Sequence, residues 1–223
     1  MESIQPVIDR MTAIGRGLPK SDGVARFNAL YLAVTEEVAA QAQGGAFEDP
    51  AALSLLDVVF ADLYFDAVDA AAAKRKIPRA WRPLFEARAR KGVHPLQFAF
   101  AGMNAHINHD LVLAIVDTCK RARTKVERGS PFHRDYLAVN KLLAKVEKTV
   151  KRQFLTGDLR IADEKLGRLD DVLAMWSVGA ARDAAWNHAE FLSHLPQFAH
   201  EPFLDTLAGS VGMASRGLLV RVL

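Results

Sequence analysis

Apolar residues recur at the spacing of an α-helix along most of this 223-residue chain, and strand patterns are nearly absent. No alternating run of Val, Ile and Thr stands out, and no Asn-Gly pair marks a hairpin turn. Residue types that favour helices, such as Ala, Leu, Arg, Lys and Glu, are frequent. We therefore predict an all-α fold, a single compact domain of about seven or eight helices that spans residues 1–223.

Glycine and proline divide the chain into the expected helices. The predicted tail helix begins at Pro202, although Gly209, Gly212 and Gly217 disfavour it. No repeat and no linker long enough to separate two domains is visible. The remaining predicted helices cover 4–14, 24–43, 50–75, 82–90, 96–125, 134–154 and 165–194.

Cysteine content and hydropathy indicate the compartment. The chain has one cysteine, Cys119, so no intrachain disulfide can form, which is typical of a reducing compartment. The first residues lack the basic and apolar regions of a signal peptide. No apolar run approaches the roughly 20 residues that a transmembrane helix needs. We therefore expect a cytoplasmic protein.

The net charge of +3 hides an uneven distribution. Residues 1–73 carry four cationic and eleven anionic side chains, whereas residues 74–91 carry eight and one, and residues 120–153 carry eleven and three. The two basic segments can form the solvated faces of helices, or they can attract a phosphate-bearing partner or an anionic membrane. Neither contains a specific nucleic-acid motif.

The stretch AGMNAHINHD, residues 101–110, places polar side chains in the middle of an apolar predicted helix. His106 shares a face with Asp110, four residues on, and with His109, three residues on. Asn104 and Asn108 are also four apart, but on nearly the opposite side of the helix. Asp117 lies about two turns after Asp110, and therefore on its side.

Buried polar groups cost about 1–3 kcal/mol each when unpaired, so these side chains need partners. They can form a hydrogen-bond network that holds helices in register, line a pocket, or bind a divalent metal. In a pocket His106 is the candidate base or metal ligand, Asp110 orients it or is a ligand, and His109 is a second ligand or an acid. Asn104 and Asn108 are candidate ligand-binding residues of the same segment.

Two other predicted helices supply further candidates. Asp62, Asp66 and Asp69 share a face of the third helix, either as a solvated acidic face or as a face that binds a cation, and Asp66 is the candidate ligand-binding residue. Arg182 and Trp186, four apart, can clamp an anion and stack on a planar ligand. Alternatively, Arg182 pairs with Asp110 or with an Asp of the third helix, and Trp186 only packs.

Several known chemistries lack their motifs in this chain. Glu-x-x-His pairs, His-Glu-x-x-His, paired cysteine ligands, Gly-x-Ser-x-Gly and phosphate-binding glycine loops are all absent. His109-Asp110 matches the pair of the metal-dependent His-Asp phosphohydrolases, but the only upstream histidine is His94. Asp170-Asp171 is half of the Asp-rich motif of terpene synthases. Both remain minor alternatives.

The segment GMNAHINHDL, residues 102–111, resembles a bacterial family of unknown function that is common in actinobacteria. QFAFA before it, VLAIVDTC after it and RDAAW at 182–186 fit the same resemblance, which covers most of the chain. It implies a helical single-domain protein whose signature is the polar segment, and it attaches no activity, cofactor or partner.

The polar segment and its apolar neighbours Phe98, Phe100 and Met103 favour one function class. We expect an enzyme that acts on a small, largely apolar molecule by His/Asp acid–base or metal-assisted chemistry. The alternative is a non-catalytic protein that binds a small molecule or a partner, with the same residues as an internal polar network.

Overall fold

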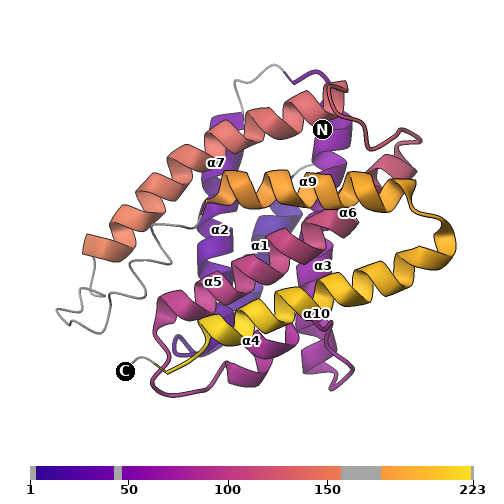
Figure 1. Cartoon of the computed structure of the whole chain (residues 1–223). Coiled ribbons are helices and arrows are strands. Elements are labelled where there is room, and N and C mark those ends of the chain that lie inside the picture. The colour runs from indigo at the N-terminus through magenta and orange to yellow at the C-terminus, as the bar shows by residue number, and fades with distance from the viewer. Residues whose placement is uncertain (1–3, 43–46, 157–176, 222–223) are drawn as a thin grey trace.

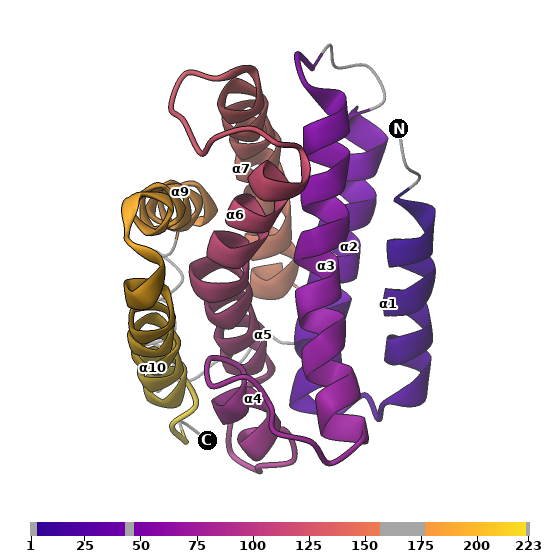
Figure 2. The same ribbon diagram turned by 90° about the vertical axis from the view of Figure 1, so that its right-hand side faces the viewer.

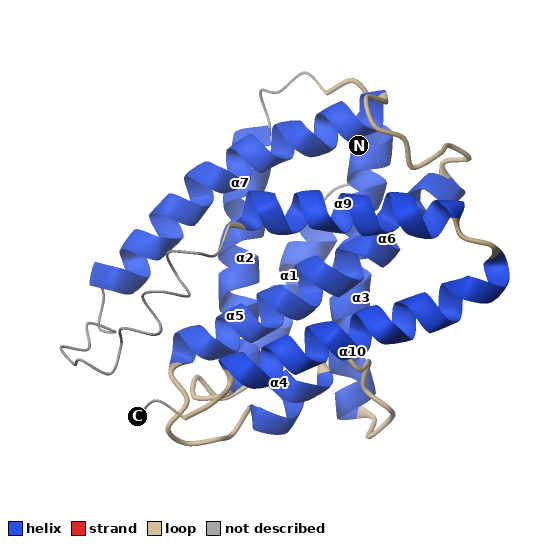
Figure 3. Cartoon of the chain, viewed as in Figure 1, coloured by secondary structure: helices blue, strands red, loops and turns tan. Residues whose placement is uncertain are grey.

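The computed structural model describes residues 4–42, 47–156 and 177–221. Every regular element in these residues is helical (Figure 3), which confirms the all-α prediction. The elements are α1 (Gln5–Gly17), α2 (Gly23–Ala42), α3 (Pro50–Ala72), α4 (Arg82–Ala87), α5 (Pro95–Ala105), the π-helical turn η1 (His106–Asp110), α6 (Leu111–Arg121), α7 (Pro131–Thr156), α9 (Val178–His194), the 3-10 turn η3 (Gln197–Ala199) and α10 (His200–Leu218).

The central helix, formed by α5, η1 and α6 in direct succession, lies between two layers of helices (Figures 1 and 2). Helices α9 and α10 cover one side of it, and α2 and α3 cover the other, with α1 outermost. Helix α7 packs against α2, α3 and α9 and so joins the layers. The central helix is therefore surrounded on most of its circumference, as its apolar sequence requires.

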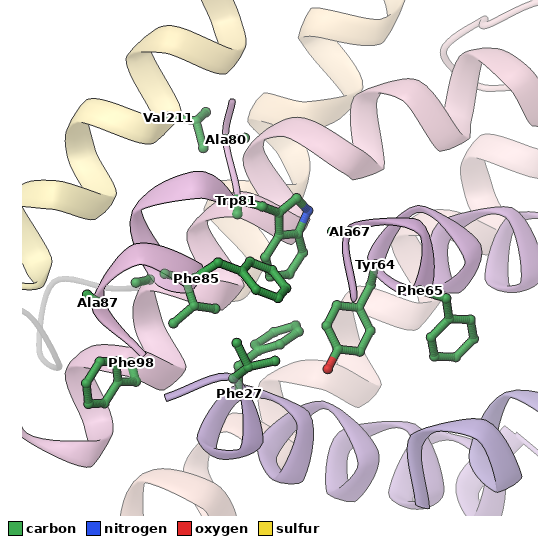
Figure 4. Packing of buried hydrophobic residues seen from close by; sticks show 14 of the residues in the cluster. Phe27, Tyr64, Phe65, Ala67, Ala80, Trp81, Phe85, Ala87, Phe98 and Val211 are labelled. Atoms are coloured by element: carbon green, nitrogen blue, oxygen red, sulfur yellow. The ribbon is translucent and has the colours of Figure 1, made fainter. Parts of the chain in front are cut away.

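Two apolar clusters meet at the central helix. One gathers around Phe27, Tyr64 and Trp81 (Figure 4), and the other around Leu111 and Trp186. Partly buried Met103 of α5 packs against both clusters. Met103 belongs to the polar segment, which thus lies at the junction of the two halves of the core.

Helix α10 forms in spite of its glycines because two of them allow a close approach. A Cβ atom at Gly212 would lie 2.9 Å from the carbonyl oxygen of Arg79, and one at Gly209 would lie 3.0 Å from the Arg79 guanidinium. The glycines lower the helix propensity of α10, but they allow it to lie close to the segment before α4.

Several helix boundaries differ from the prediction. The first helix continues through Gly15 to Gly17. The last helix begins at His200 rather than at Pro202. The late helix begins at Val178 in the described part of the chain, and the first residues predicted for it, 165–176, lie outside that part, as do Asp170 and Asp171.

Candidate functional site

The sequence predicts one uninterrupted α-helix here, but the central helix contains a turn of another kind. At its midpoint the Leu111 amide donates to the carbonyl oxygen of His106, five residues earlier, so η1 is one turn of π-helix. Single π-helical turns inside α-helices occur frequently at functional sites. The turn contains His106, His109 and Asp110, all of them buried. The polar segment and the backbone irregularity therefore coincide.

Asp110 is the centre of the polar cluster. Its Oδ2 atom accepts a hydrogen bond from Trp81 Nε1 at 2.8 Å and lies 3.2 Å from His106 Nδ1, and its Oδ1 atom lies 2.8 Å from His109 Nδ1. Burial opposes ionisation of this carboxyl, but the hydrogen bonds from His106 and His109 outweigh it, and the Asp110 pKa is below its ordinary value. Asp110 is thus an ionised, buried and fully hydrogen-bonded carboxylate.

His106 is a neutral imidazole held in one orientation. Burial lowers its pKa below the ordinary value, although the neighbouring Asp110 acts in the opposite direction. Because Nδ1 faces a carboxylate, the proton of the neutral ring is assigned to Nδ1. The Nε2 atom, on the opposite edge of the ring, then carries a free lone pair, and it is buried without a hydrogen-bond partner.

Five aromatic side chains surround the His106 ring, and we call them the aromatic cage. Phe60 stacks on the imidazole with 3.6 Å between ring centroids and 6° between planes, and Tyr31 follows at 4.5 Å. Phe27, Tyr64 and Trp81 lie 5.8–6.2 Å away. Figure 4 shows these last three rings converging from α2, α3 and the start of α4.

The aromatic cage is closed on one side and reaches the surface on the other. Phe27, Tyr64 and Trp81 are buried, whereas Tyr31 and Phe60 are only partly buried. Tyr31 and Phe60 are thus the two members of the aromatic cage that solvent reaches.

Arg182 lies on α9, packed against α7. Its guanidinium lies over the Tyr136 ring at 4.1 Å and donates to Asn140 Oδ1, while Tyr136 Oη donates to the Arg182 carbonyl oxygen at 2.7 Å. The Arg182 charge also reaches Asp57 of α3, whose pKa it lowers in part. Among the described residues, Arg182 forms neither of the ion pairs expected for it, with Asp110 or with an Asp of the third helix.

Asp57 combines exposure with strong desolvation. Solvent reaches its side chain, yet the surrounding protein raises its pKa to about 6, against the opposing influence of Arg182.

The four residues predicted to bind a ligand lie apart from the His106 cluster. Asn104 donates to the Val211 carbonyl oxygen and to Ser215 Oγ, both at 2.9 Å, and accepts from Asn108 at 2.9 Å, so this pair attaches the central helix to α10. The remaining two are Trp186, buried against Phe132, His133 and Tyr136, and Asp66, exposed on α3.

Two further predictions are changed by the structure. Asp117 does not extend the polar cluster, because it pairs with Arg121 at 2.7 Å where the central helix approaches solvent. His94, the upstream histidine of the phosphohydrolase alternative, accepts from the Leu96 amide and caps α5. That alternative therefore gains no support from the arrangement.

The metal hypothesis rested on His106, His109 and Asp110. Both histidines turn Nδ1 toward the Asp110 carboxylate, which binds them by hydrogen bonds. Among the residues that the structure describes, no group of three or more His, Cys, Asp or Glu side chains is placed to hold a metal ion. The geometry favours a hydrogen-bonded triad.

Sequence reasoning missed Tyr31, Asp57, Phe60 and Trp81 as site residues. Asp57, Phe60 and Tyr64 are three and seven residues apart, a spacing that places them on one face of α3 and that the sequence does contain. Trp81 offered no signal, because it joins Asp110 from 29 positions away in the chain.

The fold and the cluster define an all-α protein with a buried His–Asp centre at a π-helical turn. Residues 4–221 match the model of a family of unknown function, DUF5995, and the chain belongs to this family. No curated protein and no solved structure matches the chain. Within the described residues, no helix is both long and apolar enough to cross a membrane.

Proposed function

We propose that this protein is an enzyme that acts on a small, largely apolar molecule, with His106 as the general base and Asp110 as the residue that orients it. The observation that carries the proposal is the neutral imidazole whose Nδ1 is fixed by a carboxylate and whose Nε2 is buried and unpaired. An unpaired buried acceptor costs about 1–3 kcal/mol, and at His106, unlike at the α5 cap His94, it lies on a ring whose other nitrogen faces a buried carboxylate.

The roles of the residues follow from their contacts. When Nε2 takes a proton from the substrate, the imidazolium forms beside the ionised Asp110, which stabilises it. Trp81 and His109 donate to the same carboxylate and hold it in place. The aromatic cage supplies an apolar lining, and Tyr31 or Phe60 must move to admit a substrate because Nε2 is closed to solvent.

A second candidate is a protein that binds a small molecule without transforming it. The same aromatic cage favours it, because Nε2 can accept one hydrogen bond from a ligand whose body packs on the rings. For either activity we expect a reducing compartment such as the cytoplasm, given the single cysteine.

Turnover of nitrobenzisoxazole separates the two candidates. This small aromatic probe loses its C3 proton to a base while its N–O bond breaks, which yields a coloured cyanophenolate. We expect the wild-type protein to accelerate the reaction, and His106→Gln and Asp110→Asn to lose about tenfold or more of that rate. Asn108→Ala, in the same turn but on the α10 side, is the matched control and should keep the wild-type rate. Equal rates in wild type and folded His106→Gln would contradict general-base catalysis.

Elemental analysis of the purified, untagged protein tests the metal-assisted variant. A stoichiometric metal that disappears in His106→Ala would replace the acid–base proposal by metal-assisted chemistry. The hydrogen-bonded arrangement predicts no such metal in either sample.

A further inference from the structure

The two basic segments of the sequence lie on either side of the turn that joins α9 to α10. Arg79, from the segment that follows α3, pairs with Asp205 of α10 at 2.7 Å. Arg128, from the segment that follows α6, pairs with Glu190 of α9 at 3.0 Å. Segments that are far apart in the chain thus flank one corner of the molecule, at the right of Figure 1. We call residues 74–79, 117–128 and 190–205 together the basic corner.

Both flanking loops of the basic corner expose cations that have no ion pair within the described part of the chain. These are Lys74, Arg75 and Lys76 in the first loop and Lys120, Arg123 and Lys125 in the second. In total the basic corner has nine Lys and Arg side chains against five Asp and Glu side chains, an excess of four. The uneven charge of the sequence is therefore concentrated in space as well, and it attracts anions.

The helix dipole explains only part of this charge. Lys74 and Arg123 follow the ends of α3 and α6 with φ angles of 53° and 55°, a left-handed conformation in which Gly is the usual residue after a helix. A cation at this position interacts favourably with the helix C-terminus, but the effect fades within one turn. Lys76 and Lys125, further along the two loops, have no such role.

Aromatic side chains project from the same corner. Phe198, in the turn η3 between the two helices, is 84% exposed, and Phe191 of α9 is 53% exposed. Phe191 lies beside Phe203 of α10, with 5.5 Å between the ring centroids. His200 Nε2 lies 2.9 Å from the Leu195 carbonyl oxygen and closes the turn around Phe198. The fold thus holds an apolar tip between two cationic loops.

We propose that the basic corner is a docking surface for an anionic membrane. The unpaired cations of the two loops attract acidic lipid headgroups, and Phe198 enters the boundary between the headgroups and the acyl chains. A nucleic acid duplex would also attract the cations, but its phosphate backbone offers no apolar layer for Phe198. This inference goes beyond the proposed function and does not depend on it.

Co-sedimentation of the full chain with lipid vesicles tests the surface. The probes are phosphatidylcholine vesicles with and without phosphatidylserine. We expect the wild-type protein to bind the phosphatidylserine vesicles about tenfold or more tightly than the others, and to be released between about 0.1 M and about 1 M salt, because salt screens exposed charges. Equal binding to both kinds of vesicle, or to neither, would overturn the inference. Binding to duplex DNA without binding to phosphatidylserine vesicles would overturn it as well.

Paired substitutions locate the contact in the two loops. The variant of the first loop is Arg75→Ala with Lys76→Ala, and the variant of the second loop is Lys120→Ala with Lys125→Ala. Each should weaken binding to phosphatidylserine vesicles by about tenfold or more, because one cation near an acidic surface contributes about fivefold. Unchanged binding in both variants would contradict the inference.

A matched control removes the same charge elsewhere. Arg16 of α1 and Lys141 of α7 are exposed outside the basic corner. The variant Arg16→Ala with Lys141→Ala should bind as wild type does, and a loss as large as that of the loop variants would show that net charge alone causes binding. Phe198→Ser tests the apolar tip and should weaken binding by about tenfold, because its ring no longer leaves water. Wild-type binding by this variant would contradict insertion of Phe198.

Discussion

The two polar sides of the central helix differ in how completely their hydrogen bonds are made. On the α10 side, the Asn104 amide donates to Val211 and Ser215 and accepts from Asn108, and Ser215 donates onward to the Ala101 carbonyl oxygen. On the α3 side, Asp110 binds three donors, but His106 keeps one nitrogen unpaired.

Within one helix, this difference distinguishes side chains that hold the fold together from side chains that can form a functional site. Some side chains only hold α10 in register. They stabilise the fold most when every donor and acceptor has a partner. A base must keep its lone pair free, and the protein gives up stability to do so. The lowered pKa of His106 belongs to the incomplete side, and His106 and Asp110 begin and end the π-helical turn, which is why we assign function there.

The largest expected effect is the loss of the buried carboxylate. Asp110→Ala leaves the donors on Trp81, His106 and His109 without their acceptor, and we expect about 3–5 kcal/mol less stability. Urea denaturation measures the change. A loss below about 1 kcal/mol would mean that the cluster is hydrated and not the closed network described here.

Asn104→Ala examines the opposite side of the helix. It removes the contacts to α10, and we expect a loss of about 1–3 kcal/mol in the free energy of unfolding. Probe turnover should stay at the wild-type level once the protein is folded. A turnover loss as large as that of His106→Gln would show that the two sides do not differ in role.

The pH dependence of stability isolates His106. Its native pKa is depressed, so as pH falls below about 6.5 the unfolded chain takes up a proton that native His106 refuses, and stability is lost. His94 and His133, whose pKa values are also lowered by burial, contribute to the same trend in every variant. Urea midpoints measured from about pH 7 to 5 should therefore fall less in His106→Gln than in wild type. Parallel curves would contradict a depressed pKa at His106.

The smallest effect is expected from Asp57→Asn. The native pKa of Asp57, about 6, exceeds the value of about 3.9 in an unfolded chain, so its ionisation destabilises the fold as pH rises through this window. The variant should be slightly more stable than wild type near neutral pH, and the difference should vanish below about pH 4. Asp66→Asn is the control, with no expected change. Destabilisation at neutral pH would mean that Asp57 has a structural partner.

The sequence predicted those features of the structure that depend on residues close together in the chain. Glycine and proline marked most helix ends, and the four-residue spacings placed His106 with Asp110 and Asn104 with Asn108. The π-helical turn was missed, because five residues are too few to alter the apolar periodicity. Trp81 and Asp57 were missed, because their neighbours are set by the packing of distant helices.

The central claim is that His106 is a neutral base with its proton on Nδ1 and a free lone pair on Nε2. The nitrogen chemical shifts of its ring, measured by NMR at neutral pH and assigned with His106→Gln, test this directly. We predict one protonated nitrogen bonded to Asp110 and one unprotonated nitrogen of the pyridine type. Two protonated nitrogens, or a proton on Nε2, would contradict the claim and leave His106 as part of a structural network.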